Sequence, residues 1–418
     1  MNEAANLFDA ACADCVACGR RHDVTARTAA CTCERQENLS IRYALGACTA
    51  TELRRSLDAG TPSLWRYAPL LPVGQRFASP LQVGWTPLLD CGPVGAVRLL
   101  LKDETRNPSG SLKDRASEVV VAVAVAHAID DVIVASTGNA AVSLACIGAA
   151  AGVRVTVLVP ETVPAAKLVQ LVAYGARVHR VAGRYDDACE MADKIARARG
   201  SLNRSTGINP FTREGKKTCA LEIAEQMDWQ APDWVIVPTG DGNILSAVWK
   251  GFRELAELGW LRTLPRLVAA QSVASSVIAR RHDSRIAAAD PPVRTMADSI
   301  TVDRPRDATA ALAALRDSQG LAVAVDDREI IAAVRTLAAR YGVFVEPSSA
   351  AAFAAFERLR AADAFAPRQR VVCIATGSGL KDPRPVQADV DAIAAPPVPP
   401  HAWRDLLAAP APPGSAWS

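Results

Sequence analysis

The sequence is poor in aromatic residues, nearly neutral in charge, and free of long apolar runs. Phe, Trp and Tyr make up 5% of its 418 residues, whereas 50% are hydrophobic, so much of the core must consist of small aliphatic side chains. The formal net charge of +3 gives no electrostatic basis for wrapping nucleic acid. The longest apolar run, residues 119–126, is far shorter than the roughly 20 residues that a bilayer requires, so no membrane partner is expected.

The N-terminal segment lacks the pattern of a secretory signal. Its first ten residues are acidic, with no basic stretch ahead of an apolar one, so the predicted location is the cytoplasm. In that compartment the eleven cysteines should be thiols or metal ligands. Five of them cluster between positions 12 and 33. Five others are scattered, as is typical of buried small hydrophobic residues: Cys91, Cys146, Cys189, Cys219 and Cys373.

The clustered cysteines have the spacing of a small metal site. They read C-x-x-C-x-x-C-G and, twelve residues later, C-x-C. This pattern predicts one structural zinc held by four thiolates, with the ligands Cys15, Cys18, Cys31 and Cys33. Cys12 competes with Cys15 for a place in the set, and a thiol-rich arm without metal is the alternative.

From about residue 132 the pattern is that of an α/β protein. Short β-branched runs alternate with helical segments, which predicts parallel sheets covered on both faces. Strands are expected at 132–136, 153–160, 176–181, 234–238, 266–271 and 370–376, and helices from about 140, at 165–174 and at 185–199. Ligands of such sheets bind beyond the carboxyl ends of the strands. The Pro- and Ala-rich residues from 394 onward predict an extended tail.

The segment at 101–116, L-K-D-E-T-R-N-P-S-G-S-L-K-D-R-A, carries the strongest chemical signal. It contains a turn and then a helix start, which Ser109 or Ser111 could cap. Lys113 falls in the first helical turn, where positive charge is disfavoured and a neutral amine is easier to form. A neutral lysine amine is the nucleophile that attacks a carbonyl. The alternative is an exposed helix lysine paired with Asp114.

Three glycine-containing loops follow predicted strands. They are A-S-T-G-N-A-A at 135–141, V-P-T-G-D-G-N-I at 237–244 and A-T-G-S-G-L-K-D-P at 375–383. The middle loop opens a helix and presents backbone amides to an anion, but it lacks the lysine of a nucleotide-triphosphate loop. Taken with Lys113, the loops fit a cofactor that has a phosphate, a carbonyl and a ring.

The chain resembles threonine synthase and its relatives in the fold-type II family of pyridoxal-phosphate (PLP) enzymes. The resemblance covers residues 65–383 and rests on W-R-Y-A-P-L-L-P, G-W-T-P-L, N-P-S-G-S-L-K-D-R, S-T-G-N, P-T-G-D-G-N-I, E-P-S-S-A-A-A and T-G-S-G-L-K-D-P, in order and spacing. It implies a tryptophan synthase β-like homodimer with two doubly wound α/β domains and a Cys-rich N-terminal arm. The implied boundaries are 1–48 for the arm, 49–125 and 205–393 for the large PLP-binding domain, 126–204 for the small domain, and 394–418 for the tail.

The resemblance also implies roles for single residues. Lys113 bonds covalently to the cofactor and later moves protons. The other implied cofactor contacts are Asn139 at the phenolic oxygen, Thr376 at the pyridine nitrogen, and Thr239, Gly240, Asp241, Gly242 and Asn243 at the phosphate. Ser136 and Thr137 lie where the substrate carboxylate docks. A hydroxyl at the ring nitrogen gives a weaker electron sink than a carboxylate, which favours elimination and replacement over transamination. An ordinary turn threonine is the alternative for Thr376.

The departures from the family concern the substrate. In N-P-F-T-R-E-G-K-K-T (209–218), Thr212 stands where relatives have an arginine that holds the substrate phosphate, and Arg213 follows it. Ser378 replaces a histidine, and Ala140 a threonine. Arg213 and Lys102 are the candidates for holding a substrate phosphate, with a solvated loop residue as the alternative for Arg213.

Three functions are compatible with these features. The first is threonine synthase, which converts O-phosphohomoserine and water to threonine and phosphate, or a diverged relative. The second is β-replacement or dehydration of a serine, phosphoserine or threonine-like substrate. The third is a non-catalytic binding module with a PLP fold. The expected partner is a small amino acid, phosphorylated in the first case.

Overall fold

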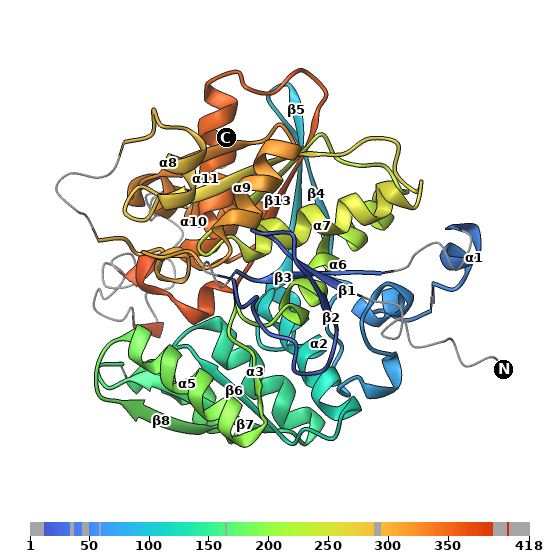
Figure 1. The fold of residues 1–418 in the computed structure, drawn as a ribbon. Coiled ribbons are helices and arrows are strands. Elements are labelled where there is room, and N and C mark those ends of the chain that lie inside the picture. The colour runs from blue at the N-terminus through green and yellow to red at the C-terminus, as the bar shows by residue number, and fades with distance from the viewer. Residues whose placement is uncertain are drawn as a thin grey trace. The chain divides into compact units, whose positions relative to one another are not determined.

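The protein is represented by a computed structural model that describes residues 12–33, 37–43, 50–57, 60–163, 165–287, 294–387 and 399–400. Three sheets organise it (Figure 1). Residues 1–382 form one unit and residues 383–418 another, in which the turn Arg384–Val386 is described. Most of the predicted tail from 394 onward lies outside the described residues. No helix among those described is long and apolar enough to cross a bilayer.

The largest sheet has six strands in the order β12-β11-β10-β13-β5-β4. Neighbouring strands are parallel except β4, which runs antiparallel to β5 at one edge. Their bounds are β4 (Leu88–Val94), β5 (Val97–Asp103), β10 (Trp234–Pro238), β11 (Arg266–Ser272), β12 (Leu321–Val325) and β13 (Arg370–Ala375). The register of β4 shifts between Asp90 and Gly92. All five residues of β10 are buried, as expected for a strand with both faces covered.

A smaller parallel sheet and a ribbon complete the strands. The small sheet has the order β8-β7-β6-β9, with β6 (Asp131–Ala135), β7 (Arg154–Pro160), β8 (Arg177–Val181) and β9 (Leu202–Asn203). The cysteine-rich segment forms an antiparallel ribbon in the order β2-β1-β3, with β1 (Cys12–Cys15), β2 (Arg21–Asp23) and β3 (Leu39–Arg42). The sequence predicted an arm, and the described part of it is this ordered ribbon.

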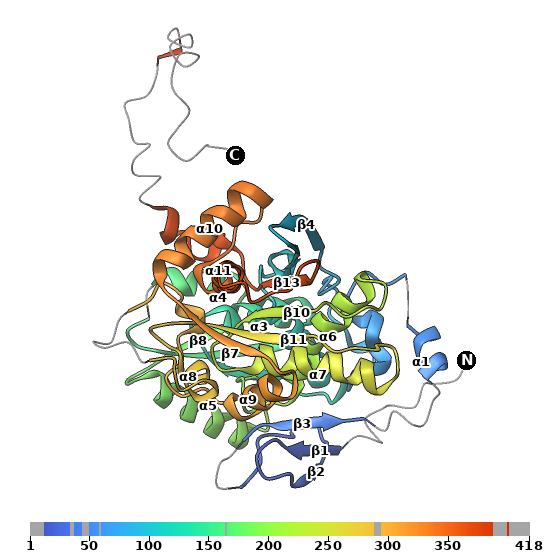
Figure 2. The same cartoon turned by 90° about the horizontal axis from the view of Figure 1, so that it is seen from above.

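Helices cover both faces of the six-stranded sheet. In Figure 2, α10 and α11 lie on one side of it and α7 and α9 on the other, and the ribbon lies beyond α7 and α9. The helices are α1 (Ala50–Arg55), α2 (Lys113–Ala126), α3 (Asn139–Ala151), α4 (Val169–Ala173), α5 (Tyr185–Arg199), α6 (Phe211–Gln226), α7 (Asn243–Glu257), α8 (Val277–His282), α9 (Ala308–Asp317), α10 (Asp327–Tyr341) and α11 (Pro347–Ala361).

Local chemistry explains several helix boundaries. α10 starts with a capping box in which Asp326 and Glu329 exchange side-chain and backbone hydrogen bonds. It ends at Gly342, which adopts the left-handed conformation that favours glycine. The expected serine cap of α2 is wrong: its N-cap is Leu112, and no side chain caps it. Ser109 instead donates to the carboxylate of Asp114 through both its N–H and its hydroxyl.

Candidate active site

The lysine turn and two of the predicted loops meet at the carboxyl ends of the strands. The Leu112 N–H donates to the Thr376 carbonyl over 2.9 Å, and Ser378 N–H donates to the Gly110 carbonyl over 3.0 Å. The Asn139 amide donates to both carboxylate oxygens of Glu346, at 2.9 and 3.0 Å. The chain therefore brings the segments after β6 and β13 to the start of α2, which carries Lys113.

Lys113 has the environment of a nucleophilic amine. It is the first residue of α2, and burial lowers its pKa, with Asp241 opposing the shift and Arg204 adding to it. Its Nζ has no hydrogen-bond partner in the described part of the chain. The alternative pairing with Asp114 is not formed, because that carboxylate accepts two bonds from Ser109. A lowered pKa raises the fraction of neutral amine, which is the form that attacks a carbonyl.

The loop between β10 and α7 is built to hold an anion. Among the described residues, the N–H groups of Gly240, Asp241 and Gly242 have no partner, and they precede a helix of 15 residues. Gly242 has φ +94, and a Cβ there would lie 2.7 Å from another side chain, so only glycine fits. Unpaired amides at a helix N-terminus favour a phosphate. These groups fit the phosphate of PLP, as Lys113 fits its carbonyl.

Two cations that sequence reasoning missed lie close to this loop. Lys216, fully buried on α6, donates to the Asn243 side-chain oxygen at 2.5 Å. Burial, together with the charge of Lys113, lowers its pKa well below the usual range. Arg204, also fully buried, donates to the Lys113 carbonyl at 3.4 Å, and burial lowers its pKa to about 10. Neither forms an ion pair with a carboxylate among the described residues, although the nearby Asp241 favours the charged form of both.

Glu346 is the third group that the sequence did not single out. It precedes Pro347 at the start of α11, and its backbone N–H donates to the Gly377 carbonyl over 3.0 Å. Burial raises its pKa, which the Asn139 amide partly opposes. The motif E-P-S-S-A-A-A contains this residue, but no spacing rule connects it to Asn139.

The structure places Lys102 and Arg213 away from the roles expected of them. The Lys102 ammonium is fully buried and donates to Glu222, Gln226 and the Thr86 carbonyl at 2.7 to 2.9 Å. Arg213 is 2% exposed and pairs with Asp307 at 2.5 Å. It is therefore not a solvated loop residue either. Both cations have protein partners and contribute to internal packing, so we do not retain them as substrate contacts.

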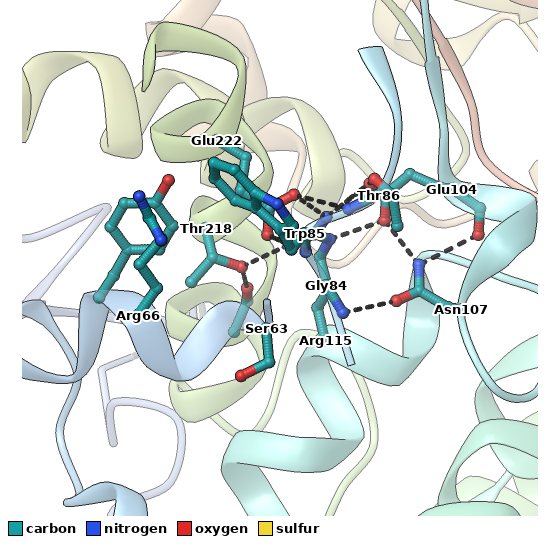
Figure 3. Close-up of polar contacts among 12 residues, drawn as sticks. Ser63, Arg66, Gly84, Trp85, Thr86, Glu104, Asn107, Arg115, Thr218 and Glu222 are labelled. Atoms are coloured by element: carbon teal, nitrogen blue, oxygen red, sulfur yellow. Dashed lines mark hydrogen bonds and ion pairs between the residues drawn. The ribbon is translucent and has the colours of Figure 1, made fainter. Parts of the chain in front are cut away.

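A buried ion network supports the helix that carries Lys113. Figure 3 shows Arg115 between Glu104 and Glu222, with hydrogen bonds from its guanidinium to each carboxylate at 2.6 to 2.7 Å. Glu222 also accepts the Trp85 N–H at 2.7 Å, and the side chains of all three charged residues are fully buried. Since Arg115 lies two residues after Lys113, the network fixes the start of α2 against α6.

The four ribbon cysteines lie together as predicted. Their sulfur atoms are all within 4.8 Å of one another, with Cys15 to Cys33 at 3.8 Å and Cys18 to Cys31 at 3.9 Å. A tetrahedral zinc with Zn–S bonds of about 2.3 Å would require sulfur separations of about 3.8 Å. The donors therefore fit a zinc ion. The His22 ring nitrogen lies 3.3 Å from the Cys31 sulfur and could orient that ligand.

The remaining predicted residues directly follow strands. Ser136 and Thr137 are partly exposed at the end of β6, where the Ser136 hydroxyl accepts the Gly138 N–H at 3.2 Å. The Thr239 N–H is used within the sheet, donating to the Ala270 carbonyl.

Among the scattered cysteines, Cys91 is half-buried and the other four are buried. They are small packing residues, as predicted.

Comparison with known proteins gives a consistent assignment. The family model "Pyridoxal-phosphate dependent enzyme" matches residues 80–377. The chain is 37% identical to a threonine synthase of Methanocaldococcus jannaschii over 88% of this chain and 92% of that protein. It is 38% identical to one of Methanosarcina acetivorans over 81% and 87%, respectively.

Structural comparison confirms the predicted fold class. Maize serine racemase superimposes with a TM-score of 0.60 at 21% identity, over 74% of this chain and 92% of that one. At that identity the likeness concerns the fold alone, which is the fold-type II arrangement of parallel-rich α/β sheets. Residues 80–377, which the family model matches, contain Lys113 and the loops at 135–141 and 237–244. The chain thus belongs to the family of pyridoxal-phosphate dependent enzymes.

Proposed function

We propose that this chain is a PLP-dependent lyase of the threonine synthase type. It eliminates phosphate from O-phosphohomoserine and adds water to form threonine. The observation that carries the proposal is the partly buried Lys113, with its lowered pKa, near a loop of unpaired amides and two buried basic side chains, Lys216 and Arg204. The extent of identity to threonine synthases supports the same reaction.

Each site residue has its own proposed role in this reaction. When bound, PLP supplies an electron sink for the substrate carbon that loses a proton. Lys113 bonds to the cofactor, and its amine then moves protons between substrate carbons. Asn139 and Thr376 would hold the ring, and the Thr376 hydroxyl would accept or donate a hydrogen bond there without protonating the ring nitrogen. Ser136 and Thr137 hold the substrate carboxylate.

Positive charge decides which substrate the site accepts. Residues 239–243 would hold the cofactor phosphate, and Lys216 is bonded to this loop through the Asn243 side-chain oxygen. Arg204 remains as a cation for an anionic leaving group, because it forms no ion pair with a carboxylate among the described residues. A phosphate ester provides that anion, which supports a phosphorylated amino acid as the substrate.

A second candidate is a PLP enzyme that acts on phosphoserine or a related β-substituted amino acid. The resemblance expects a phosphate-binding arginine at Thr212, and the Arg213 guanidinium is paired with Asp307, so a substrate phosphate would have to be held elsewhere, as in a shorter amino acid. The two candidates separate when O-phosphohomoserine and O-phosphoserine are offered in parallel and the products are identified by mass. Turnover of neither ester would contradict both.

Lys113 provides the direct test of the chemistry. Lys113→Ala should abolish turnover and remove the visible absorbance of the holoenzyme that borohydride reduces, while PLP still binds through its phosphate. Lys113→Arg retains the charge but cannot form the covalent bond, so it should be equally inactive. Lys194→Ala, at an exposed lysine on α5, is the control and should retain activity. Activity in either Lys113 variant would contradict the assignment, and a colourless protein that cannot be loaded with PLP would favour a binding module.

We also propose that Cys15, Cys18, Cys31 and Cys33 bind one structural zinc. Protein made with ample zinc should contain about one metal ion per chain. Cys18→Ser should release it, whereas Cys91→Ser, outside the cluster, should not. Metal-free wild-type protein would leave the ribbon as plain thiols.

The oligomeric state, the location and the domain boundaries are proposed from the same resemblance. We propose a cytoplasmic homodimer in which residues 126–204, with their own four-stranded sheet, act as the small domain, and 49–125 with 205–393 act as the large one. Light scattering of the purified protein tests the dimer, and cell fractionation tests its location. Limited proteolysis tests the boundaries near 126 and 204.

A further inference from the structure

The cysteine ribbon is bonded directly to the helices that flank the phosphate loop. Arg213, near the start of α6, donates to the Leu39 carbonyl of β3 at 3.0 Å. Lys250 of α7 donates to the Ile41 carbonyl at 2.7 Å. The Thr309 hydroxyl of α9 donates to Glu37, just before β3, at 2.7 Å. Three helices on one side of the large sheet therefore depend on the position of β3.

One of these contacts continues to the phosphate loop. The second terminal nitrogen of Arg213 pairs with one carboxylate oxygen of Asp307 at 2.5 Å. The other oxygen of Asp307 accepts the Asn243 amide at 3.0 Å and the Ser246 hydroxyl at 2.7 Å. The Asp307 N–H donates to the Asp241 carbonyl at 3.1 Å. A continuous series of bonds thus joins β3 to Asp241 and Asn243 of the phosphate loop.

Burial makes this connection costly to break. Arg213 is 2% exposed and Asp307 is fully buried, so water cannot replace a lost partner. A buried charge that loses its partner is strongly destabilising. If β3 shifts, Arg213 must therefore move to keep its hydrogen bond to the Leu39 carbonyl, and Asp307 must move to keep its ion pair with Arg213. Asp307 cannot move without moving Asn243, whose side-chain oxygen holds Lys216.

The four thiols fix the position of β3. Cys15 lies at the end of β1 and pairs with Leu39 of β3 in the antiparallel register. Cys31 is linked to the residues before β3 by a 2.9 Å bond from its N–H to the Glu37 carbonyl. A ligand shared by the four sulfur atoms would hold these segments at one spacing, whereas its loss would release them.

We propose that Arg213 and Asp307 are positioning residues through which the cysteine ribbon sets the geometry of the phosphate loop, so that cofactor affinity depends on the state of the four thiols. The inference rests on the proposed PLP and zinc sites. It assigns Arg213 to the cofactor side of the site, through Asp307, in place of the substrate contact expected from the sequence.

The test measures release of PLP from the holoenzyme by dialysis and absorbance, without reference to turnover. Arg213→Gln should raise the cofactor dissociation constant about 5- to 150-fold, the usual range of coupling between two sites. Arg213→Lys retains the buried cation and should recover part of the affinity, which also keeps the test open if the glutamine variant does not fold. Arg253→Gln, at an exposed arginine of α7 paired with Glu257, is the matched control and should leave the constant unchanged.

A double-mutant cycle tests the connection to the ribbon. Cys18→Ser should weaken cofactor binding in the wild-type background but have a much smaller effect beside Arg213→Gln, because the connecting bond is already lost. Equal effects in the two backgrounds, or unchanged affinity in both Arg213 variants, would overturn the inference while leaving the proposed function intact. Failure of the wild-type protein to bind PLP at all would instead contradict the proposed function.

Discussion

Removing one charge from the buried network at α2 should destabilise the protein severely. Glu222 accepts hydrogen bonds from Lys102 at 2.7 Å, from Arg115 at 2.6 and 2.7 Å, and from the Trp85 N–H at 2.7 Å. In Glu222→Gln the side chain keeps its size but loses its charge, and its new NH2 group faces donors. Arg115 then keeps Glu104 as its carboxylate partner, whereas Lys102 loses its ion pair and keeps Gln226 and the Thr86 carbonyl.

The expected cost follows from this burial. Breaking a fully buried ion pair by removing one partner costs about 3–5 kcal/mol. We expect a loss of that size in the free energy of unfolding, measured by urea denaturation with tryptophan fluorescence. Glu257→Gln breaks an exposed i,i+4 pair with Arg253 and should cost about 0.3–0.5 kcal/mol, which makes it the control.

The same experiment can refute the reasoning. A loss below about 1 kcal/mol for Glu222→Gln would mean that the network rearranges around the amide and does not fix α2. If the loss is large but borohydride-sensitive absorbance of the folded variant is unchanged, the network stabilises the fold without positioning Lys113. Both outcomes are read from one preparation.

Two further predictions concern α6. Glu214 and Glu222 both have a pKa lowered to about 2 by buried lysine and arginine partners, with desolvation opposing the shift. The two ionised carboxylates therefore stabilise the folded state fully above the pKa of the unfolded carboxyl, and this stabilisation is lost as the pH falls toward 2. Urea titrations should give a constant unfolding free energy above about pH 5.5 and a steep decline below it. Gly215→Ala would place a Cβ 1.9 Å from the Arg115 carbonyl, where α6 crosses α2. It should cost about 1–3 kcal/mol or more, whereas Gly74→Ala, with nothing within 4 Å, should be neutral in the same denaturation assay.

Much of the fold could be predicted because buried parallel strands have a plain sequence pattern. The runs at β10 and β13 are almost wholly apolar and β-branched, and both were predicted within a residue of their bounds. β5 was missed because it carries Lys102 and Asp103, whose charges are satisfied only by tertiary partners. β12 was missed because L-A-V-A-V is equally compatible with a helix.

Site residues within the lysine turn and the glycine-containing motifs were predicted, whereas the contacts that α6 makes with the site were not. The segment at 209–218 was treated as a loop, but α6 begins at Phe211. In a helix, neighbouring residues point about 100° apart, so an arginine one position along faces a different partner. Arg213 consequently meets Asp307, while Lys216 reaches Asn243. Because nearly every residue of α6 is buried, no apolar face indicates which side meets the site.

The irregular edge strand β4 has a consequence for self-association. An exposed strand edge with regular N–H and carbonyl spacing can pair with the same edge of another molecule. In β4 the register shift between Asp90 and Gly92 breaks that spacing, and Pro93 has no N–H to offer. The edge therefore resists continuous β-pairing between copies, which protects concentrated protein from stacking into fibres. At this edge, contact with another molecule would depend on side chains, whose chemistry is more selective than that of the backbone.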